Sequence, residues 1–246
     1  VLITGGAGFI GHMFIKELIE NTDYEVISMD RLDYSGNLNR ISDMMKSYNQ
    51  ADQNRLKVIH HDLKAEINNL VATQIGDVKH FFHIAASSHV DRAIEDPMSF
   101  VMDNVVATCN ALDFSRKLDN LETFVYFSTD EVFGSIELPS KFNEYSPYDP
   151  RSPYSASKAS SDHLVNSWFH TYGVDTITTN CSNNYGPWQF PEKLIPLVIL
   201  KALNNEDIPI YGDGKNVRDW IYVGDHVNGL LYSAVHGKGG EKYCIG

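Results

Sequence analysis

The stretch that decides the fold opens the chain: Val1-Leu2-Ile3-Thr4-Gly5-Gly6-Ala7-Gly8-Phe9-Ile10-Gly11. A short apolar run, 1–4, leads into glycines at 5, 8 and 11, and an amphipathic run, 9–20, follows. Glycines at this spacing let the backbone turn tightly, approach a diphosphate closely and pack a helix against a strand. The free N–H groups at the start of the helix then face the phosphates. The stretch predicts a nucleotide-binding strand–loop–helix unit.

The second predicted strand ends at Asp30, nineteen residues after Gly11. A carboxylate there accepts hydrogen bonds from both hydroxyls of an adenosine ribose and repels a 2′-phosphate. This favours NAD as the cofactor, although the neighbouring Arg31 leaves NADP open. Asp62, after the third predicted strand, has two compatible interpretations: a contact to the adenine amino group, and the N-cap of a helix that begins near Lys64.

Short apolar runs alternate with longer amphipathic runs over residues 1–180. Such alternation predicts an α/β fold with a doubly wound, Rossmann-like parallel sheet that helices cover on both faces. The expected strands are 1–4, 25–29, 57–60, 80–85, 123–128 and 175–179. The expected helices are 9–20, 38–47, 64–71, 98–117 and 153–172.

After Asn180, prolines and glycines become frequent. We place a domain boundary there, between an NAD-binding domain, 1–180, and a smaller substrate-binding region, 181–246. In the smaller region the pattern predicts a helix at 193–203 and strands at 208–211 and 241–245. Residues 216–235 are expected to pack back on the first domain.

Composition excludes several classes of protein. The chain has 246 residues, of which 43% are hydrophobic and 21% charged, enough apolar material for a globular core. A net charge of −12 argues against a nucleic-acid partner. The longest apolar stretch, 194–200, is much shorter than the ~20 residues of a membrane-spanning helix, and it contains Pro196.

The cysteines and histidines predict neither a disulfide framework nor a metal site. Cys109, Cys181 and Cys244 are odd in number and far apart. The histidines at 60, 61, 80 and 83 lack a matching set of partner ligands and are interpreted as strand-end or core residues. We expect a reducing, cytoplasmic setting.

Tyr154 and Lys158 lie four residues apart in a predicted helix and so share one face. A tyrosine, with an ordinary pKa of ~10, is a poor base at neutral pH. A nearby ammonium and the positive nicotinamide of NAD⁺ lower that pKa, so that the pair can take a proton from an alcohol. Lys158 can also hold the nicotinamide ribose. Alone, the spacing also fits ordinary surface packing; the glycine loop upstream favours catalysis.

Longer strings carry a resemblance to a known family. They are Ile84-Ala85-Ala86-Ser87-Ser88-His89-Val90-Asp91-Arg92, Ser128-Thr129-Asp130-Glu131-Val132-Phe133-Gly134, and the stretches 153–159, 183–187, 191–196, 209–214 and 218–220. Together with the glycine loop they resemble the extended short-chain dehydrogenase/reductase superfamily, and within it the nucleoside-diphosphate-glucose 4,6-dehydratases. The Thr-Asp-Glu string discriminates, because simple 4-epimerases of the superfamily carry only Ser or Thr there.

The resemblance implies a catalytic role for each residue of that string. Tyr154 would deprotonate the sugar 4-hydroxyl while hydride leaves C4 for NAD⁺, and Thr129 would hydrogen-bond the C4 oxygen. Glu131 would remove the C5 proton and Asp130 would protonate the departing 6-hydroxyl, before hydride returns to C6. Neighbouring carboxylates push each other's pKa values apart, as these two roles require. Both can reach one substrate only if the strand ends before them; otherwise the pair is an acidic turn.

The resemblance also implies binding residues and a homodimer, and no metal is expected. The implied cofactor contacts are Gly5, Gly8, Phe9, Ile10, Gly11, Asp30, Arg31, Leu32, Asp62, Leu63, Ile84, Ala85, Ala86, Ser88, Tyr154, Lys158 and Asn184. The implied substrate contacts are Ser88, Thr129, Asn183, Lys193, Pro209, Tyr211 and Arg218. Arg218 can bind a phosphate with two parallel hydrogen bonds, to which Lys193 adds a charge. Pro209 and Tyr211 also fit a strand edge, Asn184 a turn, and Arg218 a local ion pair with Asp219.

The chain departs from the family pattern at four positions. Phe133 stands where Tyr is usual, Ser87 where Glu is usual, and Asp33 and Asp103 where Thr is usual near the cofactor. Family members extend beyond Gly246, so a C-terminal part of the family fold is expected to be missing. Three alternatives stay open: the same reaction on a uridine-linked glucose, a nucleotide-sugar 4-epimerase, and a non-catalytic nucleotide-sugar sensor.

Overall fold

The computed structural model describes residues 1–137, 139–210 and 212–246. The strands are β1(Leu2–Thr4), β2(Val26–Asp30), β3(Leu56–His60), β4(His80–His83), β5(Thr123–Thr129), β6(Thr176–Cys181), β7(Asn183–Tyr185), β8(Trp220–Tyr222) and β9(Lys242–Ile245). The helices are α1(Phe9–Asn21), α2(Leu38–Met45), α3(Gln50–Asn54), α4(Asn69–Ile75), α5(Val90–Glu95), α6(Pro97–Phe100), the π-helical η1(Val101–Val106), α7(Ala107–Ser115), the 3₁₀ turn η2(Asp130–Phe133), α8(Pro153–Tyr172), α9(Leu194–Leu203) and α10(Val223–His236).

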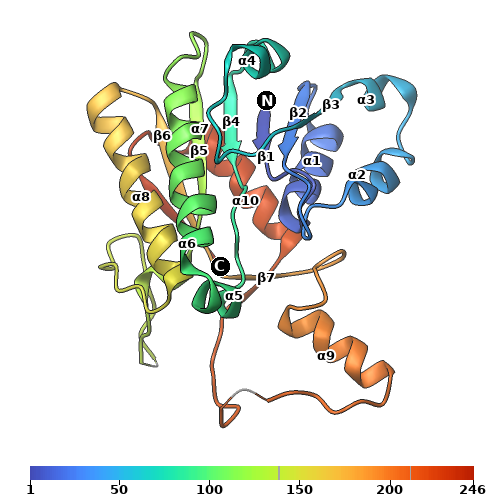
Figure 1. Cartoon of the computed structure of the whole chain (residues 1–246), viewed down its shortest axis with the longest axis vertical. Coiled ribbons are helices and arrows are strands. Elements are labelled where there is room, and N and C mark those ends of the chain that lie inside the picture. The colour runs from blue at the N-terminus through green and yellow to red at the C-terminus, as the bar shows by residue number, and fades with distance from the viewer. Residues whose placement is uncertain (138, 211) are drawn as a thin grey trace.

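Seven strands form one parallel sheet in the order β3-β2-β1-β4-β5-β6-β9, and β7 and β8 pair separately. Apolar side chains of α1 and α10 form a core on one face of the large sheet, and those of α7 and α8 form a core on the other (Figure 1). The predicted doubly wound parallel sheet is therefore confirmed. The strand order reverses between β1 and β4, which opens a crevice at their carboxyl ends.

The expected helix at 64–71 is wrong, because the side chain of Asp62 forms a turn at the start of this segment and Asn68 caps a helix that begins later. The Asp62 carboxylate accepts the N–H of Lys64, so Asp62 does not cap a helix there. The amide oxygen of Asn68 accepts the N–H groups of Leu70 and Val71, and this cap sets the start of α4. A side chain that satisfies free N–H groups fixes a helix start more strongly than apolar spacing does.

Two further expectations need correction. The expected helix at 98–117 is a run of three segments, α6, η1 and α7, with a π-helical turn in the middle. The described residues of the expected strand at 208–211 form no strand, since Ile208 and Ile210 are exposed and no described strand pairs with them. Figure 1 shows α9 apart from the large sheet, to which α10 and β9 return.

Candidate active site

One cavity of about 480 Å³ lies along the carboxyl ends of β1, β2, β4, β5 and β6. The segment that enters α9 and the start of β8 close its other side through Lys193, Leu194 and Trp220. This is the crevice in which open parallel sheets bind ligands. The cavity brings together most of the residues predicted from the sequence, which come from positions 5 to 218 of the chain.

The glycine loop forms the floor of the cavity at the start of α1. Gly5 adopts φ +75° and donates its N–H to the carbonyl of Met29 at 2.8 Å. A Cβ on Gly11 would overlap the carbonyl oxygen of Gly5, and one on Gly8 would lie 3.1 Å from it. No side chain caps the first turn of α1. Its free N–H groups and the bare backbone therefore fit a diphosphate.

Asp30 ends β2 and is fixed by two backbone amides. Its Oδ2 accepts the N–H of Ala7 at 3.0 Å, and its Oδ1 accepts the N–H of Leu32 at 2.8 Å. Burial raises the pKa of this carboxyl. Leu32 itself has φ +57° and does not line the cavity. The other predicted cofactor residues, Phe9, Ile10, Leu63, Ile84, Ala85, Ala86 and Ser88 among them, do line it.

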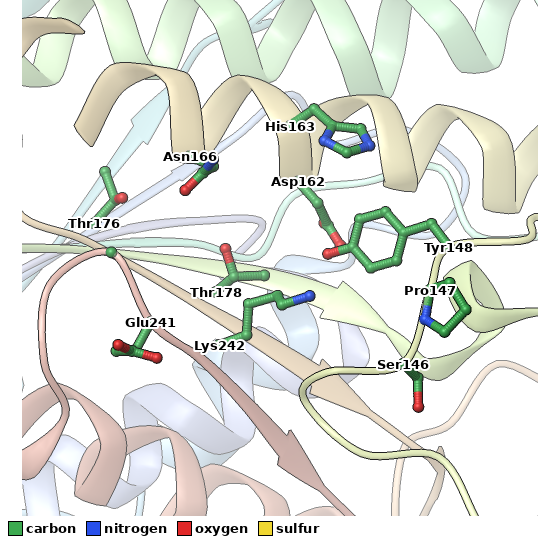
Figure 2. Close-up of a pocket in the computed structure, with 11 residues that line it drawn as sticks. Ser146, Pro147, Tyr148, Asp162, His163, Asn166, Thr176, Thr178, Glu241 and Lys242 are labelled. Carbon is green, nitrogen blue, oxygen red and sulfur yellow. The ribbon is translucent and has the colours of Figure 1, made fainter. Parts of the chain in front are cut away.

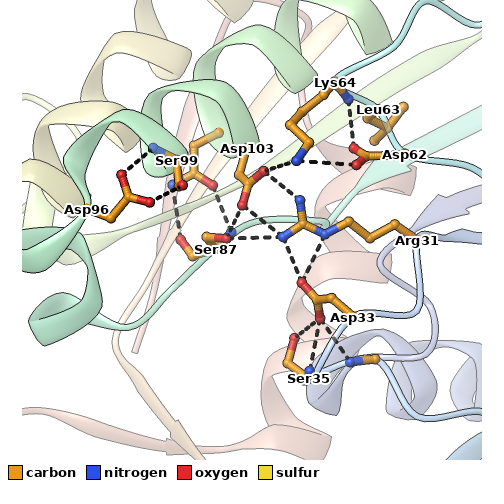
Figure 3. Close-up of polar contacts among 12 residues, drawn as sticks. Arg31, Asp33, Ser35, Asp62, Leu63, Lys64, Ser87, Asp96, Ser99 and Asp103 are labelled. Atoms are coloured by element: carbon orange, nitrogen blue, oxygen red, sulfur yellow. Dashed lines mark hydrogen bonds and ion pairs between the residues drawn. The ribbon is translucent and has the colours of Figure 1, made fainter.

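Arg31 also lines the cavity, yet its guanidinium is bound to two carboxylates of this chain, Asp33 and Asp103 (Figure 3). Asp62 lines the cavity beside this network and forms an ion pair with Lys64. The Arg31 guanidinium is therefore already bound by carboxylates of the protein itself.

Tyr154 and Lys158 project from the first turns of α8 into the cavity. The Ser152 hydroxyl accepts the N–H of Ser155 and so fixes the start of this helix. Burial raises the pKa of the Tyr154 phenol well above its usual value, and the charge of Glu131 raises it further. Burial lowers the pKa of Lys158 to about 8.

The ammonium of Lys158 points toward β5. Its Nζ donates to the carbonyl of Phe127 at 2.5 Å and lies 4.3 Å from the centre of the Tyr126 ring. The expected depression of the Tyr154 pKa is wrong for the protein alone, where burial raises that pKa. A phenolate at Tyr154 needs an additional positive charge in the cavity.

The Thr129-Asp130-Glu131 string sits where a strand ends. Thr129 is the last residue of β5, and η2 begins at Asp130, so the two carboxylates are not on opposite faces of a strand. The Thr129 hydroxyl donates to Asp130 Oδ1 at 3.3 Å and accepts the N–H of Glu131 at 3.3 Å. Thr129 and Glu131 line the cavity, while Asp130, which is hydrogen-bonded to Thr129, is not part of the lining.

Burial raises the pKa of both carboxyls of this pair. The charge of Asp130 raises the pKa of Glu131 further, while Lys193 and Arg218 lower it. Both carboxyls therefore hold a proton more readily than free carboxyls do, and the charges of Lys193 and Arg218 oppose this at Glu131.

The predicted substrate residues divide into two groups. Ser88, Asn183, Lys193 and Arg218 line the cavity, and Lys193 donates to the carbonyl of Ser88 at 2.8 Å. Arg218 donates to its neighbour's carbonyl, and no ion pair with Asp219 occurs among the described residues. Pro209 is exposed and away from the cavity lining, and Tyr211 lies outside the described residues.

Asn184 lines the cavity, and contacts with α10 and with the backbone hold its side chain in place. Its Oδ1 lies 2.6 Å from His226 Nδ1 on α10, and its Nδ2 donates to the carbonyl of Ser182 at 3.1 Å. The side chain is thus oriented by the helix that returns to the sheet.

Sequence reasoning missed several residues of this cavity. Arg40 donates to the carbonyls of Ala7 and Ser35 beneath the glycine loop, at 2.9 and 2.5 Å. Tyr34 packs edge-on against Phe190, with ring centres 5.7 Å apart. These contacts join segments far apart in the chain, and the only sequence signal was an arginine on the predicted amphipathic helix at 38–47.

A second cavity, of about 500 Å³, lies between α8, β6, β9 and the loop at 146–148 (Figure 2). None of the predicted site residues lines it. Asp162 contributes to its wall, and its charge raises the pKa of Lys158, one helical turn away. Among the described residues no cluster of three or more His, Cys, Asp or Glu could hold a metal ion, and none of their helices is long and apolar enough to cross a membrane.

Comparison with known proteins identifies the relatives of this chain. The family model described as GDP-mannose 4,6 dehydratase matches residues 2–246. The dTDP-glucose 4,6-dehydratase of Salmonella typhimurium is 46% identical over all of this chain and 71% of its own length. The crystal structure of that enzyme from Streptomyces venezuelae, with NAD bound, superposes with a TM-score of 0.91 at 40% identity, covering 100% of this chain and 74% of the other. A Thermotoga maritima UDP-glucose 4-epimerase has a TM-score of 0.86 at 28% identity and covers 100% and 76%.

Proposed function

This chain belongs to the GDP-mannose 4,6 dehydratase family, and we propose that it is an NAD-dependent hydro-lyase that converts dTDP-glucose to dTDP-4-keto-6-deoxyglucose. One observation carries the proposal: Thr129, Glu131 and Tyr154 line one cavity, and the Asp130 carboxyl is hydrogen-bonded to the Thr129 hydroxyl. A phenol and two carboxyls in one place are what a combined oxidation and loss of water requires.

The floor of the cavity fits NAD. The glycine loop leaves room for the diphosphate, the start of α1 offers free N–H groups, and Asp30 stands at the end of β2 to accept the ribose hydroxyls. NAD⁺ held by the glycine loop and Asp30 would supply the hydride acceptor for C4 and, in its reduced form, the hydride donor for C6.

Tyr154, Glu131 and Asp130 manage the protons of the reaction. Tyr154 takes the proton of the 4-hydroxyl, for which the positive charge in the filled cavity offsets the effect of burial on its pKa. Glu131 takes the C5 proton, which the adjacent 4-ketone acidifies, and gives a proton back to C5 when hydride reaches C6. Asp130 gives a proton to the leaving 6-hydroxyl, and its buried setting keeps that proton available.

The substrate's diphosphate lies toward the side of the cavity that the segment entering α9 and the start of β8 close. Lys193 and Arg218 supply cations to an otherwise acidic protein, and Ser88 and Asn183 offer polar contacts. Pro209 and Tyr211 remain proposed contacts to the nucleotide, and Asn184 a proposed contact to the cofactor. Residues 181–246 remain our proposed substrate-binding region, from which α10 and β9 return to the large sheet.

The alternatives are weaker on specific grounds. Epimerisation at C4 expels no water, so it has no use for the Asp130–Glu131 pair. A sensor without turnover would not need Tyr154 and Lys158 together in the cavity. The match to dTDP-glucose enzymes over the whole chain favours thymidine over uridine.

We also propose a homodimer formed by α6, η1 and α8 against the same elements of a second copy. Apolar side chains on this side are exposed, among them Met98 at 66%, Val101 at 40% and Met102 at 39%. Sedimentation should show a dimer that Met98→Glu weakens; a monomer at all concentrations would contradict it.

The free cysteines Cys109, Cys181 and Cys244 support a cytoplasmic location.

Turnover of two sugar nucleotides tests the function. With dTDP-glucose, the protein should form a 4-keto-6-deoxy sugar that absorbs in alkali, and UDP-glucose should react much more slowly. Equal rates would overturn the thymidine assignment. Bound NAD with no product from either sugar would favour the sensor, and a 4-epimer as the product would favour the epimerase.

A further inference from the structure

A clamp of four side chains, one of which is Arg31, lies at the β2 end of the cavity (Figure 3). We define it as Arg31, Asp33, Asp103 and Ser87. Arg31 donates through Nη1 to Asp103 Oδ1 at 2.5 Å and through Nη2 to Asp103 Oδ2 at 2.8 Å. Its Nε donates to Asp33 Oδ2 at 2.9 Å and its Nη2 to the same oxygen at 2.7 Å. Every nitrogen of the guanidinium therefore has a carboxylate partner.

The clamp is itself anchored to three separate segments. Asp103 comes from η1, and it accepts the Ser87 hydroxyl at 2.7 Å. Asn104 fixes Ser87 in turn, since it accepts the Ser87 N–H at 2.8 Å and donates to the Ser87 carbonyl at 3.0 Å. Asp33 Oδ1 accepts the N–H and the hydroxyl of Ser35, both at 2.9 Å. The carboxylates are thus oriented before any ligand arrives.

Two further cations, Lys64 and Arg40, lie at this end. Lys64 lies 3.4 Å from Asp62 and 3.6 Å from Asp103, and Arg40 donates to backbone carbonyls. Asp30 adds a further carboxylate to this part of the lining. The region therefore holds more acidic than basic side chains, and among the residues named only Arg40 has no carboxylate partner: it is buried, its Nη1 is held by two backbone carbonyls, and its Nε has no hydrogen-bond partner among the residues that the structure describes.

We propose that this clamp, and not Asp30 alone, makes the site select NAD over NADP. The inference rests on the proposed function for the identity of the cofactor as a dinucleotide. A 2′-phosphate on the adenosine ribose would lie near Asp30, where an arginine is the usual partner. Arg31 is the residue placed to serve, but Asp33 and Asp103 neutralise it and fix its direction. The chain thus carries the arginine of an NADP site in a form that cannot bind the phosphate.

Removing the carboxylates that hold Arg31 should change the preference of the site for NAD⁺ over NADP⁺ by a measurable factor. A charge-assisted hydrogen bond is worth about 1.5–3 kcal/mol, which corresponds to roughly a tenfold to hundredfold change in affinity. The double variant Asp33→Ala/Asp103→Ala frees the guanidinium and removes two charges that repel phosphate. Asp33→Asn/Asp103→Asn removes the charges but retains the shape of the clamp.

Calorimetric titration of the full chain with NAD⁺ and with NADP⁺ tests the clamp without relying on catalysis. The unaltered protein should prefer NAD⁺ by at least about tenfold. Both double variants should reduce this ratio of dissociation constants about tenfold or more, by tighter binding of NADP⁺. Adding Arg31→Leu to the Ala variant should abolish the gain. Asp43→Ala, which removes an exposed carboxylate paired with Lys46, should leave the ratio unchanged.

The outcomes separate this inference from the proposed function. An unchanged ratio in the Asn variant, with circular dichroism like that of the unaltered protein, would overturn the clamp even if the Ala variant failed to fold. A gain that persists after Arg31→Leu would overturn it as well. If the unaltered protein bound neither dinucleotide, the cofactor of the proposed function would fail, and the clamp with it.

Discussion

The buried ammonium of Lys158 donates a hydrogen bond to the backbone carbonyl of Phe127, 2.5 Å away, and so ties the face of α8 that carries Tyr154 to the centre of β5. Lys158 is only 2% exposed. Its pKa, lowered to about 8 by burial, still leaves it mostly protonated at neutral pH. The Lys158 ammonium, which we propose assists proton transfer at Tyr154, therefore also satisfies the buried carbonyl of Phe127.

Replacing Lys158 with Met should reduce kcat by about a hundredfold or more, because the charge that assists proton transfer at Tyr154 is lost. Steady-state kinetics on dTDP-glucose measures this. Lys46→Met, at an exposed position just after α2, is the control and should have no effect. Retention of more than a tenth of kcat in Lys158→Met would remove the residue from the catalytic set.

Glu131→Gln should separate oxidation from elimination. The amide cannot take the C5 proton, so the variant should still reduce its bound dinucleotide when sugar is added but should not exchange the C5 hydrogen with D₂O. Absorbance of the reduced dinucleotide and proton NMR report the two steps. The exposed Glu137→Gln is the matched control. Normal C5 exchange in Glu131→Gln would assign the base to another residue.

The glycine loop should tolerate two alanine substitutions unequally. Gly11→Ala places a Cβ against the Gly5 carbonyl oxygen, whereas Gly8→Ala brings it only to 3.1 Å. Gly11→Ala should therefore abolish NAD⁺ binding and lower the melting temperature, and Gly8→Ala should only weaken binding. Equal NAD⁺ affinities in the two variants, measured by calorimetry, would disprove close backbone packing as the reason for Gly11.

Stability should fall in mild acid because of two buried histidines. Burial lowers the pKa of both His83 and His226 to about 3, from about 6.5 in an unfolded chain. Between these values the unfolded chain binds more protons, so the free energy of unfolding decreases as pH falls from 6.5 toward 3.

At pH 5 each buried histidine should account for about 2 kcal/mol of this loss. Urea unfolding at pH 7.5 and pH 5 tests it. His83→Gln should narrow the difference between the two pH values by about that amount, and the exposed His60→Gln should not. The same pH dependence in His83→Gln as in the unaltered protein would contradict this assignment.

How far the sequence predicts this fold depends on whether the signal is local. The start and end of α8 were predicted correctly, because Ser152 caps the first turn and Gly173 adopts φ +70° at the end. The strand at 241–245 was also expected, but its partner was not, since pairing of β9 with β6 is set by tertiary structure. The helix expected at 64–71 failed because the Asp62 turn and the Asn68 cap outweigh apolar spacing.

The residues of the candidate site likewise fall into those that local sequence reveals and those that only the folded chain brings together. The glycine loop and the Thr129-Asp130-Glu131 string could be found because their residues are neighbours in sequence. Tyr34 and Arg40 could not, because packing alone brings them to the cavity. Asp33, Ser87 and Asp103 were recognised only as separate departures from the family pattern. Their convergence on Arg31 is a property of the folded chain.

The central claim is that Tyr154, Asp130 and Glu131 act on one hexose to move hydrogen from C4 to C6 while water leaves. The direct test is the reaction of dTDP-glucose that carries deuterium at C4, in ordinary water, followed by NMR of the product. The proposal predicts that the deuterium is found in the C6 methyl group, with solvent hydrogen at C5. Deuterium that stayed at C4, or was lost to solvent with no 6-deoxy product, would contradict it.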